Sequence, residues 1–179
     1  MYLYHHKIYQ NMKNVFPFLF ALILISSCEE SVEITASTTF VDNVEVSIPQ
    51  SNGTDVTYDE TATQNLTELV SNYDDITDIN IDSLSYTFTN LTGNSNAVIT
   101  SATVEINQTI VATTSNLNIG QEVTNETVFE ITDTALLNQL ENTFLTNSSV
   151  SIRFYGSAST EEGSVDFNLQ VSIGLTATF

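Results

Sequence analysis

The sequence predicts a mainly β fold, a single antiparallel β-sandwich with one or two short helices. The first observation is composition. Beyond residue 28 the chain is rich in Ser, Thr, Asn, Val and Ile and poor in Lys, Ala and Pro, which favours strands. The second is periodicity, because apolar and polar residues alternate over several segments, as they do in strands buried on one face. The third is the set of turn signals, rich in Asn and Gly, that separate these segments.

About seven to nine strands are expected, enough for the two packed sheets of an immunoglobulin-like or jelly-roll-like sandwich. The last strand has the most regular pattern, since every second residue from Val165 to Phe179 is apolar. A bend at Gly174 would keep so long a strand within a compact fold. The expected strands cover 32–40, 44–48, 79–81, 84–88, 98–106, 110–114, 128–131, 150–155 and 165–179, whereas 56–63 is only weakly patterned.

Two places within these strands predict irregular pairing. Ile79 and Ile81 hold the opposite phase to Leu84, which predicts a β-bulge near Asp82-Ser83. Asp42-Asn43 is expected to form a turn or a bulge between the two parts of one long first strand.

Two helices are expected between strands, because apolar residues recur at helical spacing over 66–76 and again over 136–144. Thr63 or Asn65 is available to cap the first helix, and Asp133 the second. Loops are expected at 51–55, 90–96 and 156–163, with a further turn at Gly120. Arg153 is expected to pair with a neighbouring carboxylate.

The leader carries the clearest functional signal. Lys13 precedes an apolar run, Val15–Ile25, whose eleven residues are fewer than the roughly 20 needed to span a bilayer as a helix. The following Ser26, Ser27 and Cys28, together with Ile25, resemble the lipobox of bacterial lipoproteins. The resemblance implies a signal peptide over 1–27, with Met1 or Met12 as its start, and a lipidated N-terminus and short spacer over 28–31. The β-sandwich domain would then cover 32–179.

This resemblance implies a location in the cell envelope. Cys28 would carry palmitate or another acyl chain and hold the protein to a membrane, most naturally the outer membrane. Glu29-Glu30 resemble the surface-export signal of Bacteroidota lipoproteins, although an ordinary acidic spacer explains them equally well. The periplasmic and the surface-exposed face therefore both remain open.

Charge excludes one class of partner. Cleavage before Cys28 leaves 152 residues with no lysine, no histidine, one arginine and all 22 acidic residues, a formal charge of −21. Such a surface repels phosphate backbones, so no nucleic-acid partner is expected. Cys28 is the only cysteine, so no internal disulfide is possible.

The missing residue types also argue against catalysis. Without histidine, lysine or a second cysteine, the mature chain lacks the usual general base, Schiff-base amine and thiolate nucleophile. No enzyme activity and no cofactor are expected. Asp78, Asn80 and Asp82 resemble the first oxygen ligands of a calcium loop, but Thr89 stands where the closing glutamate belongs. A solvated strand face explains the same spacing, so no metal site is assigned with these residues.

Two tripeptides resemble the O-glycosylation motif of Bacteroidota, an aspartate followed by Ser or Thr and then an apolar residue. They are Asp82-Ser83-Leu84 and Asp133-Thr134-Ala135, and the resemblance implies modification of Ser83 and Thr134. A strand entry and a helix cap explain the two aspartates without any glycan.

The sequence therefore predicts a non-catalytic envelope lipoprotein, a lipid-anchored β-sandwich with a structural or accessory role that binds another envelope protein. The alternative is a surface adhesion module that binds glycan or acts through Ca2+, using the loops 51–55, 90–96 and 156–163. Trp is absent, which weakens sugar stacking, but Tyr58, Tyr73, Tyr86 and Tyr155 are available instead.

Overall fold

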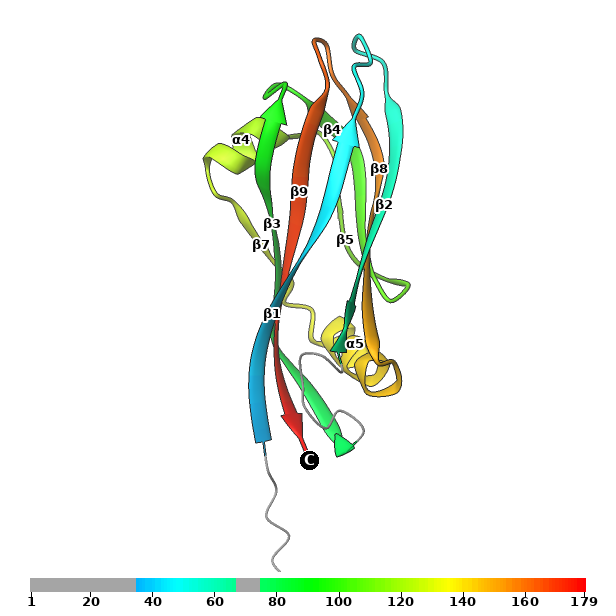
Figure 1. Ribbon diagram of the computed structural model, residues 1–179, viewed down its shortest axis with the longest axis vertical. Helices are drawn as coiled ribbons and strands as arrows, with labels where there is room; N and C mark the ends of the chain where they lie inside the picture. Colours follow the sequence, from blue (N-terminus) through cyan, green and yellow to red (C-terminus); the bar gives the residue numbers. More distant parts are fainter. Residues whose placement is uncertain (1–34, 67–74) are drawn as a thin grey trace, which may run out of the picture. The chain divides into compact units, whose positions relative to one another are not determined.

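The structure, a computed structural model, describes residues 35–66 and 75–179. This part of the chain is mainly β, with two antiparallel sheets packed face to face and two short helices (Figure 1), which confirms the predicted β-sandwich. The elements in order are β1 (Thr35–Ile48), β2 (Val56–Asn65), β3 (Asp78–Gly93), β4 (Val98–Ile106), β5 (Thr109–Thr114), β6 (Leu117–Asn118), α4 (Ile119–Thr124), β7 (Val128–Glu130), α5 (Thr134–Thr146), β8 (Ser149–Ser159) and β9 (Val165–Thr178).

The first sheet has the strand order β1-β9-β3-β7. The strongly patterned β9 lies between two long neighbours, and its pairing with β1 runs without interruption from Thr35 opposite Thr178 to Ile48 opposite Val165. The first described residue and the C-terminal strand end therefore lie at the same end of the domain. At roughly 3.3 Å per residue, the 14 residues of β1 place the opposite end about 40 Å away.

The second sheet has the order β2-β8-β4-β5, with the two-residue β6 also paired to β4. The segment 56–63, weakly patterned in the sequence, forms β2 at one edge of this sheet. The other edge is β5, which joins β4 through a tight turn at Asn107 and Gln108. Both turn residues have positive φ, 45° and 67°, as a type I′ hairpin turn requires.

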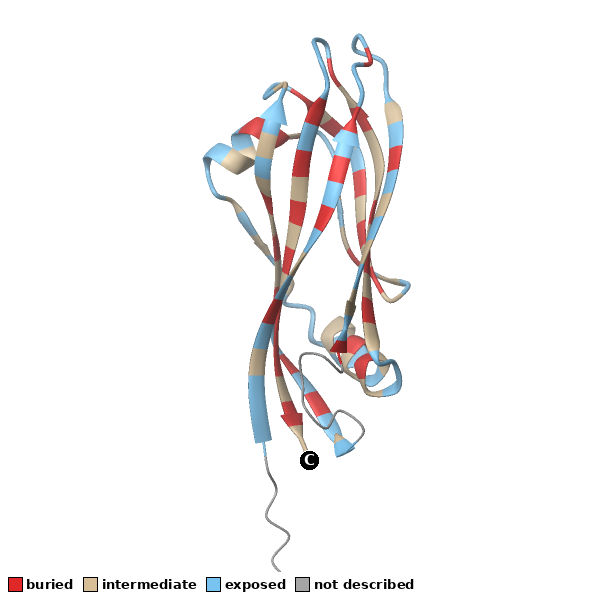
Figure 2. Cartoon of the chain, in the orientation of Figure 1, coloured by how far each residue is buried: buried red, intermediate tan, exposed pale blue. Residues whose placement is uncertain are grey.

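The core lies between the two sheets, where alternate residues of each strand are buried (Figure 2). Its centre is a group of aromatic rings contributed by both sheets. Phe154 of β8 has its ring centroid 6.1 Å from that of Phe88 and 6.4 Å from that of Phe167, both of the first sheet. All three side chains are almost completely buried. These rings join the two sheets in one hydrophobic core.

Several local predictions are confirmed. The strand 98–106 is β4 to the residue, and the predicted bulge is a register shift between Ile81 and Ser83 where β3 pairs with β9. Asp133 caps α5, since its Oδ1 accepts hydrogen bonds from the backbone N of Ala135 (2.9 Å) and Leu136 (3.2 Å). Leu140 and Phe144 of α5 are fully buried.

The predicted turn or bulge at Asp42-Asn43 is wrong, because β1 continues through both residues in unbroken register with β9. From Phe40 to Ile48 every even-numbered residue is buried or half-buried, so Asp42 is in the same phase as Phe40 and Val44. Two consecutive polar residues are typical of a turn, but the alternation of buried and exposed residues keeps the same phase before and after them.

The predicted loops at 90–96 and 156–163 are shorter than expected. β3 continues to Gly93 through a second register shift between Thr89 and Thr92, and β8 continues to Ser159. Gly156 lies within β8, where any Cβ would meet the Ser101 carbonyl oxygen at 2.0 Å. Its sequence signal indicates a turn, but the glycine serves close approach of two strands.

The predicted turn at Gly120 is also wrong. Gly120 lies in the first turn of α4, where a Cβ would come within 2.1 Å of the Ser95 carbonyl oxygen. Asn118 caps this short helix through a hydrogen bond from the backbone N of Gln121 to its Oδ1 (2.8 Å). The glycine again allows backbone contact rather than a reversal of the chain.

The expected loop at 51–55 is present and is fastened to the β8–β9 connection. Ser51 and Thr160 are both buried, and the Ser51 hydroxyl donates to the Thr160 carbonyl (3.1 Å) and accepts from the Thr160 backbone N (2.8 Å). The Gly53 backbone N also donates to the Thr160 carbonyl at 2.9 Å. The loop end of the sandwich is therefore braced from both sheets.

Some predictions fall outside the described residues. These are the leader 1–27 and spacer 28–31 with Ile25, Ser26, Ser27 and Cys28, and the greater part of the helix expected over 66–76. Leu66, at the start of that helix, is buried. Within the described ranges no helix is long and apolar enough to cross a membrane.

Candidate functional site

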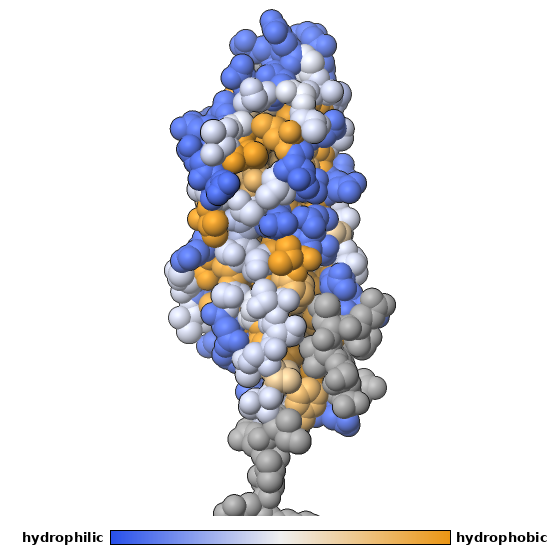
Figure 3. Space-filling view, turned by 60° about the vertical axis from the view of Figure 1, so that its left-hand side comes forward, coloured by the Kyte–Doolittle hydropathy of each residue, from blue (hydrophilic) through white to orange (hydrophobic). Residues whose placement is uncertain are grey.

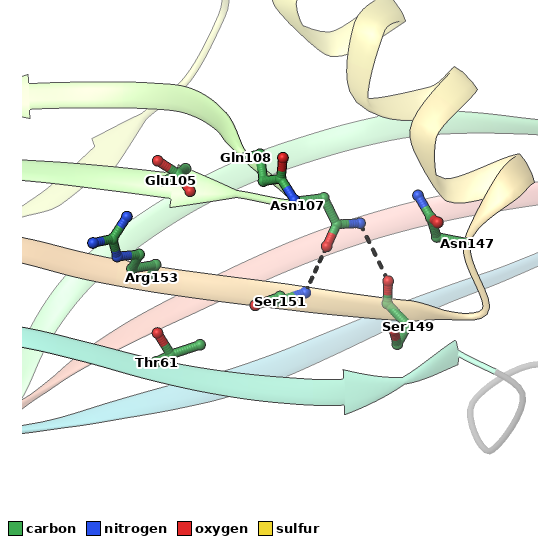
Figure 4. A pocket seen from close by; sticks show the side chains of 8 residues that line it. All are labelled: Thr61, Glu105, Asn107, Gln108, Asn147, Ser149, Ser151 and Arg153. Carbon is green, nitrogen blue, oxygen red and sulfur yellow. Dashed lines mark hydrogen bonds between the residues drawn. The ribbon is translucent and has the colours of Figure 1, made fainter.

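A polar pocket opens on the outer face of the second sheet, between the ends of β2, β8 and β4 (Figure 4). Its volume is about 450 Å3. Outward-facing strand residues form its floor, while the β4–β5 turn and the junction between α5 and β8 form one end. The lining residues are Thr61, Glu105, Asn107, Gln108, Asn147, Ser149, Ser151 and Arg153.

Arg153 provides the positive charge of this pocket and is the only strong base after Lys13. Its Nε donates to Asp59 Oδ1 at 2.7 Å and its Nη2 to Asp59 Oδ2 at 2.6 Å, which confirms the predicted pairing with a carboxylate. The guanidinium also lies over the Tyr155 ring, 4.4 Å from its centroid. Glu105 is the register partner of Arg153 on β4. The Arg153 cation therefore lies near two carboxylates, those of Asp59 and Glu105.

Hydrogen bonding from Arg153 holds the pKa of the Asp59 carboxyl below its ordinary value. Asp59→Asn is therefore expected to lower the melting temperature at pH 7, because the folded state binds the ionised carboxylate more favourably than the unfolded state does. This contribution is complete above pH about 4, the ordinary aspartate pKa, and is lost as the pH falls through the lower folded value.

Melting temperatures of the wild type and Asp59→Asn, measured from pH 7 to pH 2, check this expectation. The difference between them is expected to shrink below pH 4. Asp55→Asn, an exposed loop change that removes the same charge, is the control. A wild-type advantage that stays constant down to pH 2 would contradict the assigned ion pair.

Asn107 shapes the end wall of the pocket. Its Oδ1 accepts from the Ser151 backbone N at 2.7 Å, and its Nδ2 donates to the Ser149 carbonyl at 3.2 Å. The side chain therefore continues the pairing of β4 with β8 past the end of β4 (Figure 4). Gln108, next in the turn, places a second amide at the same wall.

The lining groups offer many hydrogen-bond donors and acceptors around a nearly balanced set of charges. Amides, hydroxyls, a guanidinium and a carboxylate together suit an uncharged ligand rich in hydroxyl groups. A phosphate or carboxylate ligand would meet Asp59 and Glu105 beside the single cation. The arrangement therefore favours a ligand that is polar but carries no net charge.

The predicted calcium residues lie elsewhere, at the start of β3. Asp78, Asn80 and Asp82 are exposed, and Asn80 Nδ2 donates to Asp82 Oδ1 at 2.9 Å. Thr176 Oγ1 donates to Asp82 Oδ2 at 2.7 Å, so both oxygens of this carboxylate accept protein hydrogen bonds. Among residues 35–66 and 75–179, no group of three or more His, Cys, Asp or Glu side chains is arranged to hold a metal ion.

Both predicted glycosylation residues are exposed. Ser83 lies at the β3 bulge, with its Oγ over Gly174, and Thr134 is the first residue of α5. Their modification remains a prediction. Ser83, Thr134 and the predicted calcium residues do not line the pocket around Arg153.

The sequence indicates Arg153 and its pairing but does not reveal Glu105, Asn107 and Gln108 as site residues. Only Asn107 carries a local signal, because Asn tolerates positive φ and is common in hairpin turns. The neighbouring positions are ordinary polar residues on a strand, and only the register of β8 with β4 makes them neighbours.

No protein-family model matches the chain, and no curated protein matches it either. Among solved structures, the decameric BFDV capsid protein is similar with a TM-score of 0.43 and 9% identity, covering 80% of this chain and 99% of that one. The Gx strain of infectious bursal disease virus gives 0.31 and 16%, covering 83% of this chain and 36% of that one. The VP2 subviral particle of the same virus gives 0.28 and 13%, covering 83% of this chain and 37% of that one. Similarities this low assign no function to the chain.

Proposed function

We propose that this protein is a non-catalytic lipoprotein of the cell envelope, most naturally of the outer membrane. Its β-sandwich, held to the membrane by lipid at Cys28, would bind another envelope protein. The leader with its lipobox-like Ile25, Ser26, Ser27 and Cys28 supports the anchor. The residue types of the mature chain support the absence of catalysis, since histidine, lysine and a second cysteine, which supply the usual general base, Schiff-base amine and thiolate, are all missing.

The observation that best supports this proposal is the position of the first described residue. Thr35 pairs with Thr178 at one end of the domain, away from the braced loops at 49–55 and 160–164. Cys28 lies seven residues earlier in the chain, a reach of at most about 25 Å when fully extended. A lipid at Cys28 would therefore keep this end of the domain within about 25 Å of the bilayer surface.

Fractionation of the native host, or of a related bacterium that expresses the full chain, tests the anchor. The wild type is expected in the membrane pellet after a carbonate wash at pH 11, because several acyl chains hold a protein firmly. Cys28→Ser, which leaves the domain unchanged, is expected to lose membrane retention. Equal recovery of both proteins in the membrane pellet would contradict a lipid anchor at this residue.

The polar pocket around Arg153 favours a second candidate function, binding of a neutral glycan at the cell surface. Sugars are recognised by amide, carboxylate and guanidinium groups that bond to neighbouring hydroxyls, and such groups line this pocket. Tyr155 adds an aromatic ring beside it. Unlike the prediction from the sequence, this candidate places the ligand on a sheet face rather than on the loops.

A panel of neutral and anionic glycans, titrated against the full-length protein, tests this candidate. Glu105→Gln and Gln108→Ala are expected to weaken binding of a neutral glycan at least tenfold, since each removes a donor or acceptor from the pocket. Gln121→Ala, an exposed change in α4, is the matched control and should bind as the wild type does. Binding that is unaffected by both pocket changes would exclude this site.

A further inference from the structure

One side of the sandwich leaves an edge strand of each sheet open. In the described part of the chain, β5 ends the second sheet and β7 ends the first, and each is paired on one side only. A cavity of about 450 Å3 lies between them. Its lining residues are Ile110, Val111, Ala112, Thr113, Glu130, Ile131, Thr132, Asp133 and Leu136, and we call it the β5–β7 groove.

Exposed apolar side chains mark the two strands that border this groove. Ile110 of β5 is 53% exposed and Val128 of β7 is 59% exposed. The described residues contain one other large exposed hydrophobic residue, Val41 of β1. Figure 3, in which the α4 and β7 side comes forward, shows separate apolar patches among hydrophilic ones on this side. A single exposed apolar residue is ordinary on a protein surface, but Ile110 lines the groove together with Ile131 and Leu136 and extends its apolar lining.

The backbone of β5 is also suited to pairing. Thr109–Thr114 contains no charged residue and no proline, although edge strands are usually protected by such residues. The one protecting feature is a β-bulge at Val111, marked by the register shift between Val104 and Glu105, and the residues on both sides of it pair regularly with β4. The unpaired edge therefore offers backbone donors and acceptors to another extended chain.

The charge around the groove defines the chemistry of its occupant. Glu130 and Asp133 lie at the groove, on a mature chain with 22 acidic residues and one arginine. An acidic segment, including a second copy of this chain, would be repelled. A segment with Lys or Arg on one face and apolar residues on the other would satisfy both the acidic residues and the apolar cavity.

We infer that the β5–β7 groove binds an extended, basic and apolar segment of a partner protein by strand addition to β5. The inference rests on the proposed function, since it names the kind of partner that an envelope binding module would take. Main-chain hydrogen bonds to β5 supply affinity, and alternate side chains directed at Ile131 and Leu136 supply specificity.

A fluorescent seven-residue peptide of alternating Lys and Val, titrated by anisotropy against the full-length protein in detergent, tests the inference. Ile110→Lys is expected to weaken binding at least tenfold, because it removes an apolar side chain from the groove and repels the basic peptide, whereas Val41→Lys is expected to leave binding within twofold. The two changes are matched, because each adds one positive charge at an exposed apolar position of an edge strand. The same peptide with alternate amides N-methylated is expected to bind at least tenfold more weakly, because it cannot pair with β5.

Hydrogen exchange of the wild type tests the same inference if Ile110→Lys does not fold. The peptide is expected to slow exchange of the Thr109–Thr114 amides and to leave β1 unchanged. Equal binding by the N-methylated peptide, equal weakening by both lysine variants, or absence of binding would each overturn the inference. Cys28→Ser protein should bind the peptide as the wild type does, so loss of the anchor and loss of the groove give different results.

Discussion

Phe154→Ala is expected to lower the free energy of unfolding by about 3–5 kcal/mol, the usual cost of removing a large buried aromatic side chain. Phe154 is fully buried and is the ring of β8 that meets Phe88 and Phe167 of the opposite sheet. Its removal would leave a cavity between the two sheets at the point where they are joined. Neither neighbouring ring can fill that space without leaving its own contacts.

Urea denaturation followed by circular dichroism measures this cost. Phe154→Leu is expected to lose much less than Phe154→Ala, because it retains most of the apolar volume. Tyr155→Ala, one residue along on the outer face, should cost less than about 1 kcal/mol. A cost for Phe154→Ala as small as that of Tyr155→Ala would mean that the two sheets do not pack through these rings.

Gly156→Ala is expected to cost more than about 2 kcal/mol, although it adds a single methyl group. The Cβ would lie 2.0 Å from the Ser101 carbonyl oxygen and 2.9 Å from the Ala102 Cα, both backbone atoms. Backbone of a paired strand cannot turn aside as a flexible side chain can, so β8 and β4 would have to separate locally.

Denaturant unfolding of Gly156→Ala beside Gly163→Asn checks this expectation. Gly163 has φ of +68°, a Cβ at this position would have no atom within 4 Å, and Asn tolerates this conformation. The Gly163→Asn change should therefore cost less than about 1 kcal/mol. Similar stability of the two variants would show that close strand approach at Gly156 is not required.

The sequence predicts those parts of the fold that depend on local pattern. The alternation over 98–106 defines β4 without error, and the phase change between Ile81 and Leu84 marks the bulge. Asp133 is recognisable as a cap because its position just before an apolar helical repeat is a local property. Each of these features depends on a few consecutive residues.

The features that the sequence does not reveal depend on partners distant in the chain. Gly120 and Gly156 indicate turns by composition, yet each is required by a carbonyl oxygen of another segment. Asp42 has the polarity of a turn residue but keeps the phase of its strand. The pocket around Arg153 depends on strand register, and the β5–β7 groove depends on which strands lie at the sheet edges. Neither property can be predicted from a pattern of consecutive residues.

Mass spectrometry of the full-length protein, extracted from membranes of its host, is the decisive test of the proposed lipid anchor. We expect a chain that begins at Cys28 and carries a mass increase of a diacylglyceryl group, with or without a further acyl chain. We also expect labelled palmitate to enter the wild type and not Cys28→Ser. An uncleaved chain, or a mature chain with an unmodified Cys28, would contradict the lipid anchor on which the proposed function depends.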